Sequence, residues 1–313
     1  MATMTPAQAR VVDPVLTKLM LGYKVPNTVY DAIFPHVTVP VRGGNVVSWS
    51  KENLRLVDHT YVPGNQVLRV EFDYSSQTFS LIDKLEAAKT PWEIMDEASK
   101  GAGVDLVSQS IASVKSRIEV EKEKLAADLA TTATNYSASN VTTYLAGAGW
   151  GGSANPLDDI HTAIGTIEDG TAGLTPNVLL LSSNAFRALK TNLAVIDQVK
   201  YMGMAPSSAS VNEKTLAEMF GLERVVVGRH RHWDGTNTVA TWGDDAVLAY
   251  SPPANPNMRE PAFGYTYQLQ GFPAVFRGYD DPQYHSRIND YQDVYQSVIT
   301  MQDAGYLFKG AAL

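Results

Sequence analysis

The 313-residue chain contains no cysteine. Disulfide bonds, thiolate nucleophiles and zinc–thiolate sites are therefore excluded. Its apolar runs, such as Val178–Leu181, are far shorter than the ~20 residues that a membrane-spanning helix needs. Near the N-terminus, Asp13, Pro14 and Lys18 interrupt any apolar region, so a secretory signal peptide is not expected. These absences predict a soluble protein made in the cytoplasm, with no membrane partner.

Basic residues are also outnumbered, with 25 Lys and Arg against 33 Asp and Glu and a formal charge of −8. Neutralisation of phosphates supplies most of the affinity of nucleic-acid-binding proteins, so tight, sequence-specific binding to nucleic acid is not expected. Hydrophobic residues make up 44% of the chain and charged residues 19%, as in a globular protein with a sizeable core. The length allows one large domain or two modest domains.

The first 90 residues lack the apolar surface for an independent core. Five prolines fall within residues 1–40, which excludes one long helix and favours an extended path. We expect this segment to form an arm along another surface, of its own subunit or of a neighbour. Residues 41–90 are predicted to form a long β-hairpin, because residues 69–74 alternate strictly between charged and apolar side chains. The charged tip of the hairpin spans residues 51–65.

Residues 94–131 carry the strongest helical pattern in the chain. Gly101 and Gly103 weaken its start, so the stable part is expected from residue 104, with a length of about 40 Å. The charged run at residues 119–124 is expected to cover the solvent-facing side. Residues 262–313 return to strand patterns, and we expect them to share one sheet with the base of the hairpin, against this helix. The apolar stripe of the helix is formed by Val104, Val107, Ile111, Val114, Ile118, Leu125 and Leu129.

Residues 156–252 alternate between helical and strand patterns, which indicates an α/β segment. Ser210 and Glu213 have the spacing of a capping box ahead of a helix that Gly221 ends. The turn at Gly243-Asp244-Asp245 is expected to join two strands in a tight hairpin. Residues 132–155, which are rich in Ser, Thr, Asn and Gly, are predicted to form a linker or surface loop.

A pair of histidines is the first candidate for chemistry. His230 and His232 lie two residues apart on a predicted strand, so that both imidazoles face one side and could bind a metal ion. Arg229 and Arg231 flank them and would repel a cation. We therefore favour a polar strand end over a metal site.

An acidic stretch is the second candidate. Asp280, Asp281, Asp290 and Asp293 could bind Ca²⁺ or Mg²⁺, which prefer clustered carboxylates. Their spacing does not match the twelve-residue calcium loop, and turn chemistry is favoured. The chain also lacks a phosphate-binding loop, a complete dinucleotide fingerprint and a serine nucleophile elbow. No catalytic residue, metal or cofactor is predicted.

Three local sequences, taken in this order and at this spacing, resemble the major capsid proteins of tailed bacteriophages. They are Leu174–Ser182 with the helix that follows, Thr241–Tyr250, and the terminal stretch Tyr291–Leu307. The resemblance covers essentially the whole chain. It implies an α+β architecture of the HK97-like capsid type, a fold shared with encapsulins and herpesvirus capsid floors.

The resemblance also implies a division that periodicity alone does not give. Residues 1–40 would form the N-terminal arm and residues 41–90 the extended β-hairpin loop. Residues 91–150 and 253–313 would form a peripheral domain around the long spine helix, and residues 151–252 an α/β axial domain. Subunits of this kind assemble into hexamers and pentamers of an icosahedral shell, which encloses double-stranded DNA without sequence-specific binding.

The implied role is structural and not enzymatic, as a virion component assembled in the host bacterial cytoplasm. The arm is too short and too proline-rich for a built-in scaffolding segment, so a separate scaffolding protein and a portal are the implied partners. Intersubunit contacts are expected from charges at the loop tip and apolar side chains of the arm, namely Lys51, Glu52, Arg55, Asp58, Val11, Val12 and Leu16.

Three alternatives stay open on the sequence alone. An encapsulin-like compartment would share the shell but enclose a protein cargo. A tail or baseplate protein would form tubes or rings. A hydrolase would use the acidic residues between Asp280 and Asp293 with a divalent ion, and would remain small.

Overall fold

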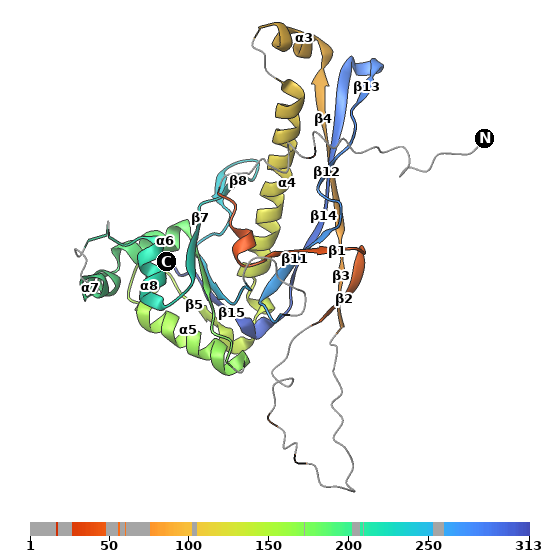
Figure 1. The fold of residues 1–313 in the computed structure, drawn as a ribbon. Helices are drawn as coiled ribbons and strands as arrows, with labels where there is room; N and C mark the ends of the chain where they lie inside the picture. Colours follow the sequence, from red (N-terminus) through yellow and green to blue (C-terminus); the bar gives the residue numbers. More distant parts are fainter. Residues whose placement is uncertain are drawn as a thin grey trace.

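The computed structural model describes residues 17, 27–47, 56, 60, 76–101, 105–171, 173–201, 207–208, 210–252 and 260–313. A six-stranded sheet runs along one side of the molecule, and a long helix lies against it (Figure 1). The 14-residue strand β14 is its centre and pairs with β4, β11, β12 and β13, while β1 extends the sheet in parallel with β11. The strands are β1 (His36–Val39), β4 (Ile82–Pro91), β11 (Gly264–Leu269), β12 (Ala274–Val275), β13 (Tyr279–Asp281) and β14 (Ser286–Ile299).

The predicted spine helix is two helices, α3 (Trp92–Gly101) and α4 (Leu106–Thr131). The expected weak start is confirmed, because α4 begins only after Asp105, whose side chain accepts hydrogen bonds from the backbone N–H groups of Val107 and Ser108. With 26 residues, α4 is about 40 Å long at ~1.5 Å per residue.

The C-terminal half of α4 departs from the predicted amphipathic pattern. Ile111, Val114 and Ile118 are buried as expected and pack against β14. Leu125, predicted to be buried, is 44% exposed, whereas Lys122 and Glu123 from the predicted solvent-facing run are buried. Lys122 is buried because it pairs with Asp293 on β14, and Glu123 is buried because a second part of the molecule packs on this half of the helix. Contact there is made by the small residues Ala126, Ala127 and Ala130.

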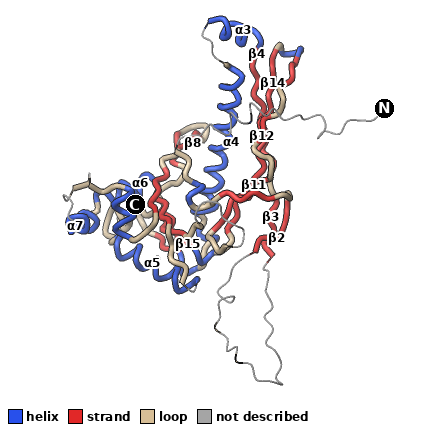
Figure 2. Tube along the Cα trace, in the orientation of Figure 1, coloured by secondary structure: helices blue, strands red, loops and turns tan. Residues whose placement is uncertain are grey.

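That second part is a five-stranded sheet with a helical layer on one face, as the α/β pattern predicted (Figures 1 and 2). Side chains alternate along its central strands. Leu179 and Leu181 face the helical layer, while Val178 and Leu180 face α4 and the turn at residues 29–34, here called the N-terminal turn. The strand order is β5 (Val141–Thr143), β15 (Gly305–Lys309), β10 (Ala246–Ala249), β6 (Val178–Ser182) and β7 (Arg224–Gly228), and the helices are α5 (Pro156–Thr171), α6 (Ser183–Thr191), α7 (Leu193–Tyr201) and α8 (Glu213–Phe220).

Two local predictions in this part are wrong. Asn212, not Ser210, caps α8, since its side chain accepts the N–H of Thr215; Gly221 ends the helix in the left-handed conformation as predicted. The turn at residues 243–245 does not close a hairpin. Strand β9 (Thr238–Ala240) pairs with β8 (Arg231–Trp233), and β10 pairs with β6 and β15 instead.

Residues 30–39, assigned to the arm, lie along the subunit's own core: Ile33 and Phe34 are fully buried next to the short helix η1 (Tyr30–Ala32). Two other segments lie elsewhere than the sequence placed them. Strand β15, expected to pack with the spine helix and its sheet, joins the five-stranded sheet. Residues 132–155, expected to form a linker or surface loop, contribute β5 to the same sheet and bury Trp150 completely. These are long-range pairings that local periodicity does not encode.

The base of the predicted hairpin is present as strands β2 (Gly43–Val47) and β3 (Ser76–Ser80), which pair antiparallel. Apart from residues 56 and 60, residues 48–75, with the alternating segment and the charged tip, lie outside the described residues.

Among the described residues, no helix is long and apolar enough to cross a membrane. The remaining elements are the short helices η3 (Ala133–Asn135), η4 (Ala138–Asn140), η5 (Pro282–Tyr284) and η6 (Gln302–Ala304).

Candidate assembly site

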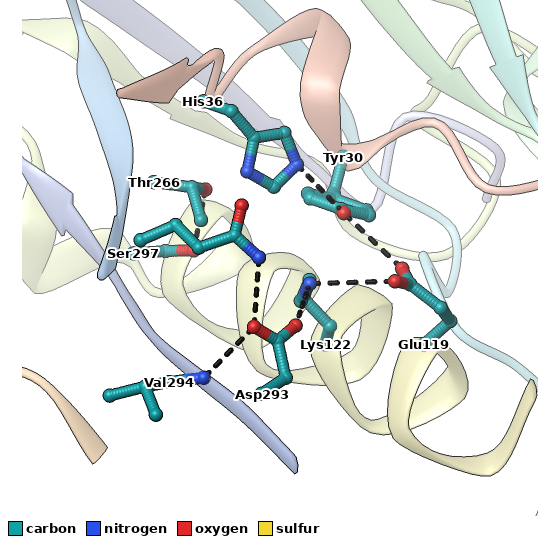
Figure 3. A network of polar contacts seen from close by, with 9 residues as sticks. Tyr30, His36, Glu119, Lys122, Thr266, Asp293, Val294 and Ser297 are labelled. Carbon is teal, nitrogen blue, oxygen red and sulfur yellow. Dashed lines mark hydrogen bonds and ion pairs between the residues drawn. The ribbon is translucent and has the colours of Figure 1, made fainter. Parts of the chain in front are cut away.

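A buried ion pair joins the spine helix to the centre of the six-stranded sheet (Figure 3). Lys122 Nζ on α4 lies 2.7 Å from Asp293 Oδ2 on β14, and the two side chains are only 2% and 0% exposed. The same ammonium lies 3.4 Å from Glu119 Oε1 and 4.4 Å from the centroid of the Tyr295 ring. Removing two charges from water is costly, and this geometry offsets the cost with several partners for the cation.

The carboxylate of Asp293 is equally well satisfied. Its Oδ1 atom accepts hydrogen bonds from Gln268 Nε2 at 2.8 Å and from the backbone N–H of Val294 at 2.9 Å. Gln268 lies on β11, so one carboxylate binds α4, β11 and β14 together. A hydroxyl pair between Thr266 and Ser297, 2.9 Å apart, adds a second polar link across the same two strands (Figure 3).

The N-terminal segment enters this network through Tyr30. Its hydroxyl donates to Glu119 Oε2 at 3.3 Å and lies 2.9 Å from His36 Nε2. Burial, and then the charge of Glu119, raises the pKa of Tyr30 well above its usual value. The His36 side chain is exposed overall on β1, but its ring packs edge-on against Tyr30; loss of water on that side and then the charge of Lys122 lower its pKa to about 4. The imidazole is therefore neutral at pH 7.

Glu123, next to Lys122 on α4, binds the backbone of the N-terminal turn. Its Oε2 atom accepts the backbone N–H groups of Val29 at 3.0 Å and Tyr30 at 3.1 Å, and its Oε1 accepts Trp242 Nε1 at 2.6 Å. Burial raises the pKa of this carboxyl, and the three hydrogen bonds oppose that shift. Arg224 on β7 donates to the carbonyl of Ala32 at 3.0 Å. The N-terminal turn is thus held by both the spine helix and the five-stranded sheet.

These groups are paired with one another, so the network is suited to holding elements in place and not to acid–base chemistry on a substrate. Within the described part of the chain, no group of three or more His, Asp or Glu side chains could hold a metal ion. His230 and His232 do face one side, where both Nδ1 atoms contact Thr241 Oγ1, at 2.9 and 3.1 Å. Asp281 caps η5 by accepting the N–H of Gln283, which is the turn chemistry expected for it.

The residues predicted as intersubunit contacts, Lys51, Glu52, Arg55, Asp58, Val11, Val12 and Leu16, lie outside the described residues. Sequence reasoning missed the roles of Lys122, Glu123 and Asp293. One signal was present: in an alternating strand, Asp293 shares a face with Tyr291 and Tyr295, which are both aromatic.

No family model matches the chain. The sequence is 26% identical to the major capsid protein of Burkholderia phage BcepMu, over 97% of this chain and 98% of that protein. It is 24% identical to the major capsid protein of Pseudomonas phage JBD67, over 96% and 97% of the two chains. A solved structure, a phage-related protein of Bordetella bronchiseptica RB50, is 31% identical and superposes with a TM-score of 0.82, over 98% and 99% of the chains.

The chain belongs to the phage major capsid protein family. More distant structures share its HK97-like capsid fold. The capsid of cyanophage P-SCSP1u is 12% identical, with a TM-score of 0.59 over 98% of this chain and 99% of that one. The SrpI encapsulin of Synechococcus elongatus PCC 7942 is 11% identical, with a TM-score of 0.55 over 99% and 96%.

The buried network ties each of the two sheets to α4 and to the N-terminal turn. The subunit can therefore present its outer surfaces in a fixed relative orientation.

The first prediction compares two lysines of the same charged run. Lys122→Met should lower the free energy of unfolding by about 3–5 kcal/mol, because it leaves Asp293 charged and buried without its cation. Lys124→Met, which removes a partly exposed partner of Asp128, should cost less than about 1 kcal/mol. Urea unfolding of the unassembled subunit measures both. Equal losses would show that the burial of Lys122 has no energetic consequence.

The second prediction concerns acid. The unfolded chain binds a proton at His36 near its ordinary pKa of about 6.5, whereas the folded subunit binds it only near 4. Stability should therefore fall as pH decreases from about 6.5 to 4. His36→Gln, which can still hydrogen-bond to Tyr30, should lose less stability across this window. Thermal midpoints of both subunits between pH 7 and 4.5 provide the comparison, and parallel curves would contradict the assignment.

Proposed function

We propose that this capsid protein assembles into hexamers and pentamers of an icosahedral shell that encloses double-stranded DNA. The single observation that carries the proposal is similarity to phage major capsid proteins along almost the whole length of both chains. The HK97-like fold is consistent with it. We further propose that the chain acts as a structural component without enzymatic activity, that it is assembled in the host cytoplasm, and that a separate scaffolding protein and a portal take part.

The proposed division of labour follows the two sheets. The six-stranded sheet with α4 supports the assignment of a peripheral domain, and the five-stranded sheet with its helical layer supports an axial domain whose loops meet at the centres of the capsomers. The ribbon of β2 and β3 is the base from which the extended loop would reach a neighbour. Contacts between different surfaces of identical subunits can close into rings, as a capsomer requires.

The DNA would be enclosed without specific contacts. A chain with a formal charge of −8 does not supply the excess of cations that phosphate binding needs. The alternative is an encapsulin-like shell around a protein cargo, and the SrpI likeness supports it only at the level of the fold. Two capsid-protein relatives at 24–26% identity favour the viral shell.

The third prediction tests this function directly. The full chain, produced alone and then together with a candidate scaffolding protein, should form closed shells or capsomers that electron microscopy and light scattering detect. Particles from infected or induced cells should contain nuclease-protected double-stranded DNA. A chain that remains monomeric in both preparations would refute the shell, and particles with a protein cargo and no DNA would favour the compartment.

The fourth prediction compares the arm with the loop tip. Deleting residues 1–16 should markedly lower the thermal midpoint of assembled particles, because apolar burial contributes most of the stability of interface cores. Neutralising the tip with Lys51→Gln, Glu52→Gln, Arg55→Gln and Asp58→Asn should lower it only slightly, since exposed ion pairs contribute about 0–1 kcal/mol each. Calorimetry of assembled particles measures the two thermal midpoints. A larger loss from the tip changes than from the deletion would contradict the prediction.

A further inference from the structure

A hollow of about 580 Å³ lies between the spine helix and the ribbon of β8 and β9. Its apolar surface comes from Val120 and Leu125 on α4 and from Trp233 on β8. Leu125 is 44% exposed and Trp233 is 66% exposed, so folding of the described subunit leaves both uncovered. We call this hollow the spine groove.

The ribbon that forms one wall of the spine groove has no further strand beside it in the described structure. Two-stranded ribbons are only marginally stable in water on their own. An indole that is two-thirds exposed on such a ribbon adds an unfavourable apolar surface. Both features would be stabilised by a segment that fills the groove.

The charges at the rim are already paired within the subunit. Arg117 lies 2.8 Å from Glu86, Lys124 pairs with Asp128, and Glu121 pairs with Lys84. Each of the three charged side chains on α4 that line the groove, Arg117, Glu121 and Lys124, is thus neutralised by a partner of opposite sign. A polyanion such as DNA finds no cationic surplus here, whereas a short apolar peptide segment with few charges fits the groove.

A segment of this chemistry lies next to a residue that is anchored in the subunit. Thr17 is fixed to β12, since its hydroxyl accepts the N–H of Val275 at 3.0 Å. Val11, Val12 and Val15 precede it, with Pro14 among them to favour an extended path. Sixteen residues before Thr17 span up to roughly 50 Å when extended, more than the length of α4.

The position of the anchor favours a neighbouring copy over the same chain. Val275 packs with Ile111 and Ile118 on the side of α4 that faces the sheet, whereas the groove residues Val120 and Lys124 lie on another side of the helix. Val12 can be at most about 17–18 Å from Thr17. A helix with its side chains is about 10–12 Å across, so reaching around it would consume most of that length.

We propose that residues 11–15 of one subunit bind in the spine groove of a neighbouring copy, between α4 and the ribbon of β8 and β9. This inference rests on the proposed shell and names the surface that receives the arm. The arm would cover Leu125 and Trp233 and brace the ribbon.

The absence of cysteine permits a direct test. Leu125→Cys in one preparation is co-assembled with Val11→Cys, Val12→Cys or Val15→Cys in another, so that each introduced thiol is the only one on its chain. Three arm positions are used because a disulfide needs Cβ atoms within about 4.5 Å. Leu145→Cys, at a position as exposed as 77% and outside the groove residues, is the matched control. Oxidised particles are then separated on non-reducing gels.

The expected result is a mixed dimer with at least one arm position, several-fold above the Leu145→Cys control. Shells that form normally but give no mixed dimer at any of the three positions overturn the inference. A chain that carries both cysteines and forms the disulfide only within itself would also overturn the inference. Failure of the wild-type chain to form shells would instead count against the proposed function.

A second measurement covers the case in which the cysteine variants assemble poorly. Trp233→Ala should lower the thermal midpoint of shells made from the intact chain, and should have little effect on shells made from a chain lacking residues 1–16. Such non-additivity indicates that the two groups interact. Additive losses would overturn the inference.

Discussion

The structure depends on the burial of adjacent charges in the spine helix. Lys122 and Glu123 point to different sides of α4, and each must find partners because an unpaired buried charge would cost several kcal/mol. Lys122 finds Asp293 in the six-stranded sheet, and Glu123 finds the N-terminal turn and Trp242. Satisfying two neighbouring side chains thus fixes the helix against both sheets at once.

This arrangement explains why the turn at residues 29–34 is so deeply enclosed. The N–H groups of Val29 and Tyr30 donate to Glu123, and Arg224 binds the carbonyl of Ala32. Phe34 packs against Gly264 so closely that a Cβ at residue 264 would lie 2.5 Å from the ring. The turn therefore lies between the two sheets and contacts both of them. What the sequence presented as part of an arm is, in this stretch, the closing piece of the subunit's own core.

Sequence reasoning succeeded where structure is local. Patterns within a few residues predicted the buried strand β6 and, from its apolar spacing, the helix α5. They also predicted the end of α8 at Gly221 and the buried stripe from Ile111 to Ile118. It failed where structure is long-range. A charged run on a helix normally faces water, and only Asp293, 171 residues away, makes Lys122 an exception. The membership of β15 in the second sheet has the same origin.

The division between buried and exposed groups bears on assembly. The charges that hold the subunit together are internal, while large apolar side chains such as Tyr201, Leu193 and Trp233 are 82%, 77% and 66% exposed. Apolar contacts are non-directional and gain strength with area, so many modest patches can add up across a shell. Orientation must then come from elsewhere. The paired charges around α4 supply it, because a rigid subunit can bring several weak patches into register with its neighbours at the same time.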